Sequence, residues 1–437
     1  MLTTRQESAT RRLSDRSPYR LTWLVWLWLA LGCQSCLAVE WPGWRGVTRD
    51  GRVPHESWPT SLGENALSLL WEIPLDPSYS GPVIGKGRVY VTETVGEKSE
   101  RVRSIDTETG EEKWRKEWTG SMKVPFFARS NGSWIRSTPT LDRDRLFVAG
   151  MRDVLVCLDA RDGREIWRVD FPERFDAPLP SFGLVCSPLV LGDAVFLQAG
   201  ASLVRLHRDT GDTVWRSLQD SGGMHGSAFS SPVESHVAGT RQLLVQTRRE
   251  MAGVAIDSGK VLWSREVEAF RGMNILTPMT YQNLIFTSTY GGGTHVFRLT
   301  AKDSGHEVND VWKNPAQGYM SSPVFIDGYA YLHLRNQRMT CFEIATGERK
   351  WTTSDRFGKY MSMITNGELI LALDERGLLL LLKPNPEKFD LVDSREVSAS
   401  STWAHVAISG DSIYVRSLDA LKKFRWKGVV FRRQKAF

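Results

Sequence analysis

The chain repeats a pattern of short apolar runs separated by polar turns. Each unit opens with a small polar residue and a proline, and continues through a Gly or Asp turn and two apolar runs. It ends in a turn whose glycine stands four residues before a tryptophan, as in "STPTLDRDRLFVAG…LVCLDARDGREIW" over residues 137–167. The runs are rich in β-branched and aromatic residues, which predicts β-strands. The pattern recurs over residues 80–114, 137–167, 186–215, 230–263 and 321–351.

The spacing of the repeats predicts the architecture. A period of roughly 40–50 residues with several short strands per unit is typical of a propeller blade. No stretch after the N-terminal segment keeps apolar residues at helical spacing for three or more turns. We therefore predict an all-β fold, an eight-bladed β-propeller. The tryptophans that set the period are Trp71, Trp114, Trp167, Trp215, Trp263, Trp312 and Trp351.

Each recurring residue has a physical role. A proline can begin a strand but cannot donate a hydrogen bond within a ladder, so the repeated prolines mark strand starts. The glycines suit tight hairpins that need a positive φ angle. The tryptophans offer large flat surfaces for packing one blade on the next. Before Trp312 the nearest glycine is Gly305, seven residues back, which predicts a longer hairpin there.

The count of eight depends on two irregular units. The seventh unit, residues 360–392, lacks both the proline and the tryptophan, with Phe389 as the nearest aromatic substitute. The eighth, residues 403–426, supplies three strands. We expect residues 69–75, which carry Trp71 with no strands before it, to add the fourth strand and close the ring, leaving few open edges. A seven-bladed ring with an irregular end is the alternative.

The N-terminus has the pattern of an export signal. Five arginines precede the apolar run of residues 21–32, which is too short to span a bilayer comfortably and suits a signal-peptide core ending at Ala38. Lipid attachment at Cys33 and an uncleaved anchor are the alternatives. The signal predicts a periplasmic or cell-envelope protein.

We divide the chain into a signal peptide (1–38), an extended arm packed on the propeller (39–67), the propeller (68–430) and a basic tail (431–437).

The net charge bears on the class of partner, and the cysteines bear on whether the fold contains disulfides. The net charge is +6, and residues 1–38 contribute five Arg against two acidic residues, so the rest carries about +3 (6 minus 3). That balance does not indicate a nucleic-acid partner. Outside the signal, the three cysteines Cys157, Cys186 and Cys341 lie in strand-like contexts, and we expect buried free thiols.

The repeat resembles that of the pyrroloquinoline-quinone (PQQ) propeller family. The resemblance rests on "DTETGEEKW" and "IATGERKW", on the preceding "SSPV", and on the arm "WPGWRGVTRDG", and it covers roughly residues 69–426. It implies a quinoprotein-like propeller fold. The family includes PQQ-dependent alcohol and glucose dehydrogenases. It also includes the barrel-assembly lipoprotein of the outer membrane, which binds no quinone and acts as a scaffold.

The chain departs from the dehydrogenase pattern of that family. Those enzymes have adjacent cysteines at the cofactor and hold Ca²⁺ with a Glu, an Asn and a catalytic Asp. Here no two cysteines adjoin, and the plain blades show no acidic residue where their inner strands begin. Because Ca²⁺ prefers several oxygen ligands, carboxylates among them, we expect no cofactor. PQQ and Ca²⁺ are expected only under the alternative of a quinoprotein oxidoreductase.

A binding site in a propeller is expected in the central funnel, which is lined by the residues that lead into each inner strand. There, Gly and Ser alternate with large polar or aromatic residues, a mixture that suits a sugar, a peptide or a small anion. In the alternative interpretation these side chains plug the funnel and satisfy one another. The candidates are Arg129, Asn131, Trp134, Arg136, His225, Asn274, Tyr319, Tyr360, Trp403 and His405.

No motif for catalysis or metal binding accompanies these residues. His225 and His405 lack a third ligand at short spacing, and the chain has no serine elbow or phosphate loop. We therefore predict a monomeric, exported, non-catalytic propeller that binds an envelope protein, a peptide or a polysaccharide. Membrane contact is expected only through a lipid or an anchor. Besides the oxidoreductase, the alternative is a carbohydrate-binding or carbohydrate-processing propeller, the latter with two facing carboxylates.

Overall fold

The computed structural model describes residues 40–53, 56–303 and 305–431. The predicted signal peptide, its alternative lipid site at Cys33 and most of the basic tail lie outside these residues. Within the described ranges, no helix has the length and hydropathy needed to cross a bilayer.

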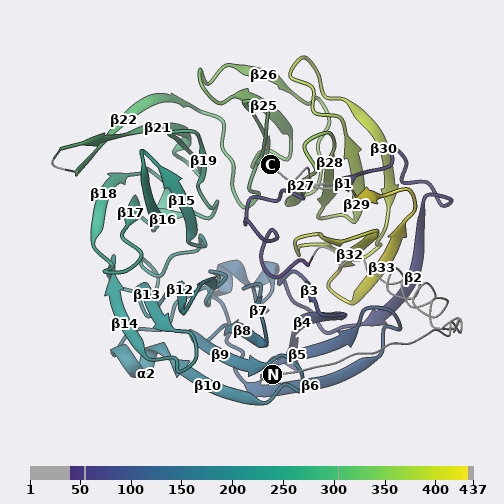
Figure 1. Cartoon of the computed structure of the whole chain (residues 1–437), viewed down its shortest axis with the longest axis horizontal. Helices are drawn as coiled ribbons and strands as arrows, with labels where there is room; N and C mark the ends of the chain where they lie inside the picture. Colours follow the sequence, from purple (N-terminus) through teal and green to yellow (C-terminus); the bar gives the residue numbers. More distant parts are fainter. Residues whose placement is uncertain (1–39, 54–55, 304, 432–437) are drawn as a thin grey trace, which may run out of the picture. The chain divides into compact units, whose positions relative to one another are not determined.

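Residues 40–431 form a ring of eight four-stranded antiparallel sheets (Figure 1). We number these sheets blades 1 to 8. Blade 1 contains β3 (Val83–Gly85), β4 (Arg88–Val95), β5 (Ser99–Asp106) and β6 (Glu112–Thr119), and blade 2 contains β7 (Thr140–Asp142), β8 (Arg145–Gly150), β9 (Val154–Asp159) and β10 (Glu165–Asp170). Blade 3 contains β11 (Leu189–Leu191), β12 (Ala194–Ala199), β13 (Ser202–His207) and β14 (Thr213–Ser217). Blade 4 contains β15 (Val233–Val237), β16 (Thr240–Gln246), β17 (Glu250–Val254) and β18 (Val261–Glu266).

Blades 5 to 7 continue in chain order. Blade 5 contains β19 (Met279–Tyr281), β20 (Leu284–Thr289), β21 (Gly293–Lys302) and β22 (Gly305–Asn314). Blade 6 contains β23 (Val324–Ile326), β24 (Tyr329–His333), β25 (Met339–Glu343) and β26 (Arg349–Thr352). Blade 7 contains β27 (Met361–Thr365), β28 (Ile370–Asp374), β29 (Leu378–Leu382) and β30 (Leu391–Glu396). Short elements outside the blades are β1 (Glu56–Ser57), β34 (Val430–Phe431), α2 (Phe171–Phe175), η1 (Phe126–Asn131) and η2 (Phe270–Gly272).

Blade 8 joins the two ends of the ring. Its strands β31 (Ala407–Ser409), β32 (Ser412–Arg416) and β33 (Ala420–Trp426) come from the end of the chain, and β2 (Leu67–Pro74) pairs with β33 as the outer strand. The pairing runs from Leu67 opposite Trp426 to Pro74 opposite Ala420. The predicted eight-bladed propeller closed by an N-terminal strand is therefore confirmed, and the seven-bladed alternative is wrong.

The repeated prolines stand directly before the inner strands, as predicted. In blades 2 to 6 a Ser or Thr stands directly before this proline, and the hydroxyl groups of blades 3 to 5 accept hydrogen bonds from the preceding blade. The amide of Thr138 donates to Ser187 Oγ (3.0 Å), the amide of Ser187 to Ser231 Oγ (2.9 Å), and the amide of Ser231 to Thr277 Oγ1 (3.1 Å). Since buried amides need partners, this chain of bonds fixes the inner strands around the centre.

The outer strand of every blade carries the same irregularity. Each has a one-residue bulge, and in seven blades a repeat tryptophan follows it. In the pair of blades 1 and 2, the indole of Trp114 donates to the carbonyl of Ala160 at 3.1 Å. A Cβ on Gly163 would lie 2.5 Å from the same ring, and Gly163 has a φ of +75°. Glycine is therefore required both for the turn and for the close approach of the neighbouring indole.

Trp263 has no such glycine in the neighbouring blade to pack against. The hairpin of β21 and β22, each of ten residues, is longer than the others, as predicted from Gly305. Trp263 in the preceding blade instead donates its indole N–H to Gln242 of its own blade, at 2.6 Å.

The prediction that Phe389 substitutes for the missing tryptophan of the seventh blade is wrong. After the bulge in β30, the residue opposite Leu381 is Asp393, so Asp393 occupies the tryptophan position of blade 7. Phe389 lies in the preceding turn, and its ring packs back against Trp351 and Phe357, 5.9 Å from each ring. The prediction failed because it sought the nearest aromatic residue, whereas the bulge fixes the position that faces the next blade.

The N-terminal arm fills the resulting gap. The Asp393 carboxylate accepts a hydrogen bond from the amide of Leu62 at 2.6 Å. Leu62 and Trp58 are buried in one cluster with Leu381 of blade 7 and Trp426 of blade 8. The rings of Trp58 and Trp426 lie 5.6 Å apart. Two apolar side chains from a distant part of the chain therefore replace the missing indole.

Cys157, Cys186 and Cys341 are buried and unpaired, as expected. Cys157 and Cys341 lie directly opposite Trp167 and Trp351 in their blades. They occupy the same position in two different sheets, so they belong to the blade cores and not to a disulfide framework.

The packing of the indoles predicts a difference between two neighbouring residues of β14. Trp215 lies against Gly259, whereas the Val214 side chain is 50% exposed. Trp215→Ala should lower the free energy of unfolding by about 3 kcal/mol, because it leaves a cavity between blades 3 and 4. Val214→Ala should change it by less than about 0.5 kcal/mol. Urea unfolding followed by tryptophan fluorescence measures both, and equal losses would contradict the assigned role.

Candidate binding site in the central cavity

The arm that precedes β2 crosses the centre of the ring (Figure 1). Trp41 exchanges backbone hydrogen bonds with Ile84 of blade 1. Arg49 donates to the carbonyl oxygens of Ser187 and Pro188 in blade 3, at 2.9 and 2.6 Å. Arg45, which is fully buried, donates to the carbonyl of Pro323 before blade 6. The arm is thereby bonded to blades on opposite sides of the ring.

Trp44 lies between these two arginines and lines the cavity described below. The guanidinium carbons of Arg45 and Arg49 are each 5.6 Å from the Trp44 ring centroid. Burial lowers the pKa of each arginine to about 10, so both carry a positive charge at neutral pH. The His405 ring lies 6.1 Å from Trp44. Through Trp44 the arm thus contributes to the cavity wall, and it places the buried positive charges of Arg45 and Arg49 beside this ring.

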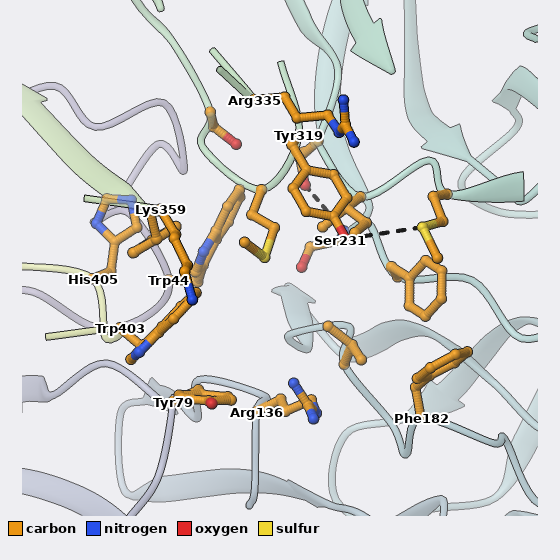
Figure 2. A pocket seen from close by; sticks show the side chains of 18 of the residues that line it. Trp44, Tyr79, Arg136, Phe182, Ser231, Tyr319, Arg335, Lys359, Trp403 and His405 are labelled. Carbon is orange, nitrogen blue, oxygen red and sulfur yellow. Dashed lines mark hydrogen bonds between the residues drawn. The ribbon is translucent and has the colours of Figure 1, made fainter. Parts of the chain in front are cut away.

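A cavity of about 740 Å³ opens at the centre of the ring (Figure 2). Every blade contributes to the lining from the same position of the repeat. This position lies three residues before the proline that starts the inner strand, or before the residue that replaces this proline in blades 7 and 8. In blades 2 to 5 the hydroxyl residues that bond the blades together stand two residues after this position, so the backbone that presents the lining is fixed. The residues at this position are Tyr79, Arg136, Val185, Phe229, Ile275, Met320, Tyr360 and Trp403.

Aromatic rings cover much of the wall. The ring centroids of Phe127 and Phe182 are 6.2 Å apart, and those of Phe182 and Phe229 are 5.8 Å apart. On another part of the wall, Tyr360 and Trp403 stack at 6.1 Å with an interplanar angle of 14°. These faces offer apolar and edge-to-face contacts to a ligand.

The charged groups of the lining all have one sign. They are Arg136, Arg335, Arg356 and Lys359, and the described lining contains no Asp or Glu. Arg136 donates to the carbonyl of Gly132 at 2.9 Å, but its buried Nε has no partner among the described residues. Burial lowers the Arg136 pKa from its usual value. The cavity is therefore positive and holds one buried donor that a ligand could satisfy.

Five of the ten candidates chosen from the sequence line the cavity. These are Arg136, Tyr319, Tyr360, Trp403 and His405.

The other five candidates lie elsewhere or are not described. Arg129 and Trp134 border a second cleft of about 430 Å³. His225 is exposed in a loop, and Asn274 is buried, donating to the carbonyl of Thr247 at 3.0 Å. The side chain of Asn131 lies outside the described residues.

Other lining residues were not chosen from the sequence. Phe229 could have been found, because it precedes Pro232 by three residues, as Arg136 precedes Pro139. Phe127 and Phe182 lie in longer loops that lead to blades 2 and 3, and Arg335 lies in the turn between β24 and β25. No repeat position points to these three residues, so they could not be predicted from the sequence.

The lining does not fit the Ca²⁺-bound quinone of the dehydrogenases. Ca²⁺ requires several oxygen ligands, and the described lining has no carboxylate. Nor do the described residues contain a group of three His, Cys, Asp or Glu side chains that could hold a metal ion. The same lining lacks the two facing carboxylates expected of a carbohydrate-processing site.

Fold and cavity together define an eight-bladed propeller with a positively charged, aromatic central site. A sequence profile for outer membrane protein assembly factor BamB matches residues 98–353, so the chain belongs to that family. The predicted membership of the PQQ-like propeller family is confirmed. The chain is 21% identical to BamB of Yersinia pestis over 375 residues, covering 83% of this chain and 86% of the relative. It is also 21% identical to BamB of Moranella endobia, covering 67% and 61%.

Solved structures show the same fold. BamB from Moraxella catarrhalis aligns with a TM-score of 0.61 at 16% identity, covering 83% of this chain and 98% of that one. Quinohemoprotein alcohol dehydrogenase from Comamonas testosteroni aligns with a TM-score of 0.63 at 12% identity, covering 91% and 82%. Similarity at this level of identity establishes the architecture and leaves activity to the site itself.

The surroundings of His405 predict a pH dependence. Burial, with Arg45 nearby, lowers the His405 pKa to about 3, against about 6.5 in an unfolded chain. Between these values the unfolded state binds more protons, so this contribution to stability is lost as the pH falls below about 6.5. From pH 7 to about 4.5, wild type should lose about 2 kcal/mol of unfolding free energy relative to His405→Gln. Urea unfolding at both pH values tests this, and a pH-independent difference would contradict it.

Proposed function

We propose that this protein is an exported, non-catalytic propeller that binds another protein of the cell envelope, with the central cavity as its binding site. The observation that carries the proposal is the composition of the cavity wall. It combines aromatic rings with unpaired cations and has no described carboxylate. Such a wall can hold a ligand, and its described lining has no carboxylate that could act as a general acid or base on one.

The size of the site is consistent with binding. A volume of about 740 Å³ lies within the range of roughly 300–1,000 Å³ found for ligand sites. It accommodates a segment of a partner and is too small for a folded domain. The ring would therefore receive an exposed part of its partner and provide a rigid frame around it.

Two further observations support a partner in the envelope. The N-terminal pattern of arginines followed by a short apolar run is typical of an export signal. The relatives are described as outer membrane protein assembly factors. An envelope protein that is itself being assembled is the partner class that both observations favour.

In vivo photo-cross-linking tests the proposal. A photoreactive phenylalanine analogue at Phe127, which is 52% exposed at the mouth of the cavity, should form an adduct with an envelope protein in cells of the native host. The same analogue at Val214, 50% exposed on the outer strand β14, serves as the control. Equal adducts at both positions, or none at Phe127, would contradict the cavity as the binding site.

A second measurement addresses the oxidoreductase alternative. The purified full chain, mixed with PQQ and Ca²⁺, should not reduce an artificial electron acceptor in the presence of alcohols or sugars. Quinone-dependent reduction that disappears on dialysis against a chelator would overturn the non-catalytic assignment.

A further inference from the structure

We propose that the central cavity binds an acidic, extended peptide segment that carries an aromatic side chain. This inference rests on the proposed function and specifies the chemistry of its ligand. Three properties of the cavity lead to it: the sign of its charge, the separation of two of its cations from its phenylalanines, and the continuation of its aromatic wall onto the surface.

The charge of the lining selects an anion. Arg136, Arg335, Arg356 and Lys359 form no ion pair within the described part of the chain. Arg335 stacks on Tyr290 at 4.1 Å and donates to its hydroxyl at 3.1 Å, which fixes the guanidinium at the cavity. The buried Nε of Arg136 has no partner. A ligand carboxylate would compensate these cations with charge-assisted hydrogen bonds.

Two of the cations lie across the cavity from the three phenylalanines, whereas Arg136 lies in the same connection as Phe127, between β6 and β7. Phe127, Phe182 and Phe229 belong to the loops that lead to blades 2, 3 and 4, whereas Arg335 and Lys359 belong to blade 6 and the loop after it. Figure 2 shows Lys359 and Phe182 on opposite sides of the cavity. A ligand that fills the site therefore needs an acidic group and an aromatic group several ångströms apart, as on neighbouring residues of a peptide.

The aromatic wall continues outside the cavity. Phe126 is 79% exposed and packs at 5.7 Å on Phe127, which lines the cavity. On the other side, Phe270 is 47% exposed and packs at 5.1 Å on Tyr290, which contacts the lining residue Tyr319 at 5.3 Å. Large apolar side chains exposed at the rim of a pocket favour a ligand that extends beyond it. A chain segment meets this requirement, whereas an enclosed small molecule does not.

The lining also contains groups that suit a peptide backbone. Asn336 and Gln337 follow Arg335 in the same turn and line the cavity. A side-chain amide can donate to a peptide carbonyl and accept from a peptide N–H. These two residues would bind the backbone between the acidic and aromatic side chains of the segment.

Isothermal titration calorimetry with three synthetic peptides tests the inference on the full chain. The probe is acetyl-Gly-Glu-Phe-Glu-Phe-Gly-amide. One control peptide replaces both Glu by Lys, and the other replaces both Phe by Ser. Only the probe should bind measurably, and raising NaCl from about 50 mM to about 500 mM should weaken its binding because the exposed cations are screened.

Three variants locate the binding. Arg136→Gln should weaken binding of the probe about tenfold or more, because a carboxylate of the peptide would lose its buried cationic partner. Lys359→Gln, at an exposed position where misfolding is not expected, should weaken it about threefold. Lys260→Gln, an exposed lysine in the turn before β18 and outside the lining, is the matched control and should leave the affinity unchanged.

The inference is overturned if the probe and the Lys peptide bind equally, if the probe does not bind, or if Arg136→Gln and Lys359→Gln behave as Lys260→Gln does. Competition by phenylacetate at equal concentration would also overturn it, since the site would then be one for small aromatic acids. These outcomes are distinguishable from failure of the proposed function. An envelope protein cross-linked at Phe127 despite no binding of the probe would retain the partner and reject only this ligand chemistry.

Discussion

The ring depends on the packing of an indole from one blade against a glycine turn of the next. A four-stranded sheet cannot bury both faces alone, and the bulge in each outer strand turns one residue toward the neighbouring sheet. Where that residue is Trp114, its ring lies on Gly163 and donates to the carbonyl of Ala160. The interaction combines apolar burial, a hydrogen bond and a conformation that favours glycine, so a change on either side of the contact disturbs both blades.

The one blade that lacks this indole shows how strongly the contact is required. Asp393 stands at the tryptophan position and bonds the amide of Leu62, and Trp58 packs beside it. The same arm then supplies Trp44 to the cavity wall and the buried Arg45 and Arg49 to the inner strands. The packing between blades 7 and 8 and one part of the cavity wall therefore depend on the same segment, and the propeller without its arm would lose both.

These observations explain which features could be predicted from the sequence. The Gly-to-Trp spacing of local hairpins predicts the blades, and Trp71 without preceding strands predicts the closing strand. The replacement of the seventh tryptophan could not be predicted, because Leu62 and Asp393 are distant in the chain and only register brings them together. In the cavity, Arg136 and Trp403 could be placed because a neighbouring inner strand fixes their direction. Arg129 and His225 were misplaced because they lie in longer loops whose path the repeat does not determine.

The proposed binding of an acidic and aromatic peptide segment in the cavity can be observed in a crystal. The decisive measurement is a crystal structure of the full chain with the Glu–Phe peptide. We expect peptide density inside the ring, with a carboxylate within hydrogen-bonding distance of Arg136 and an aromatic ring against Phe182 or Phe229. Peptide density confined to the outer strands, with the cavity holding only ordered water, would contradict it.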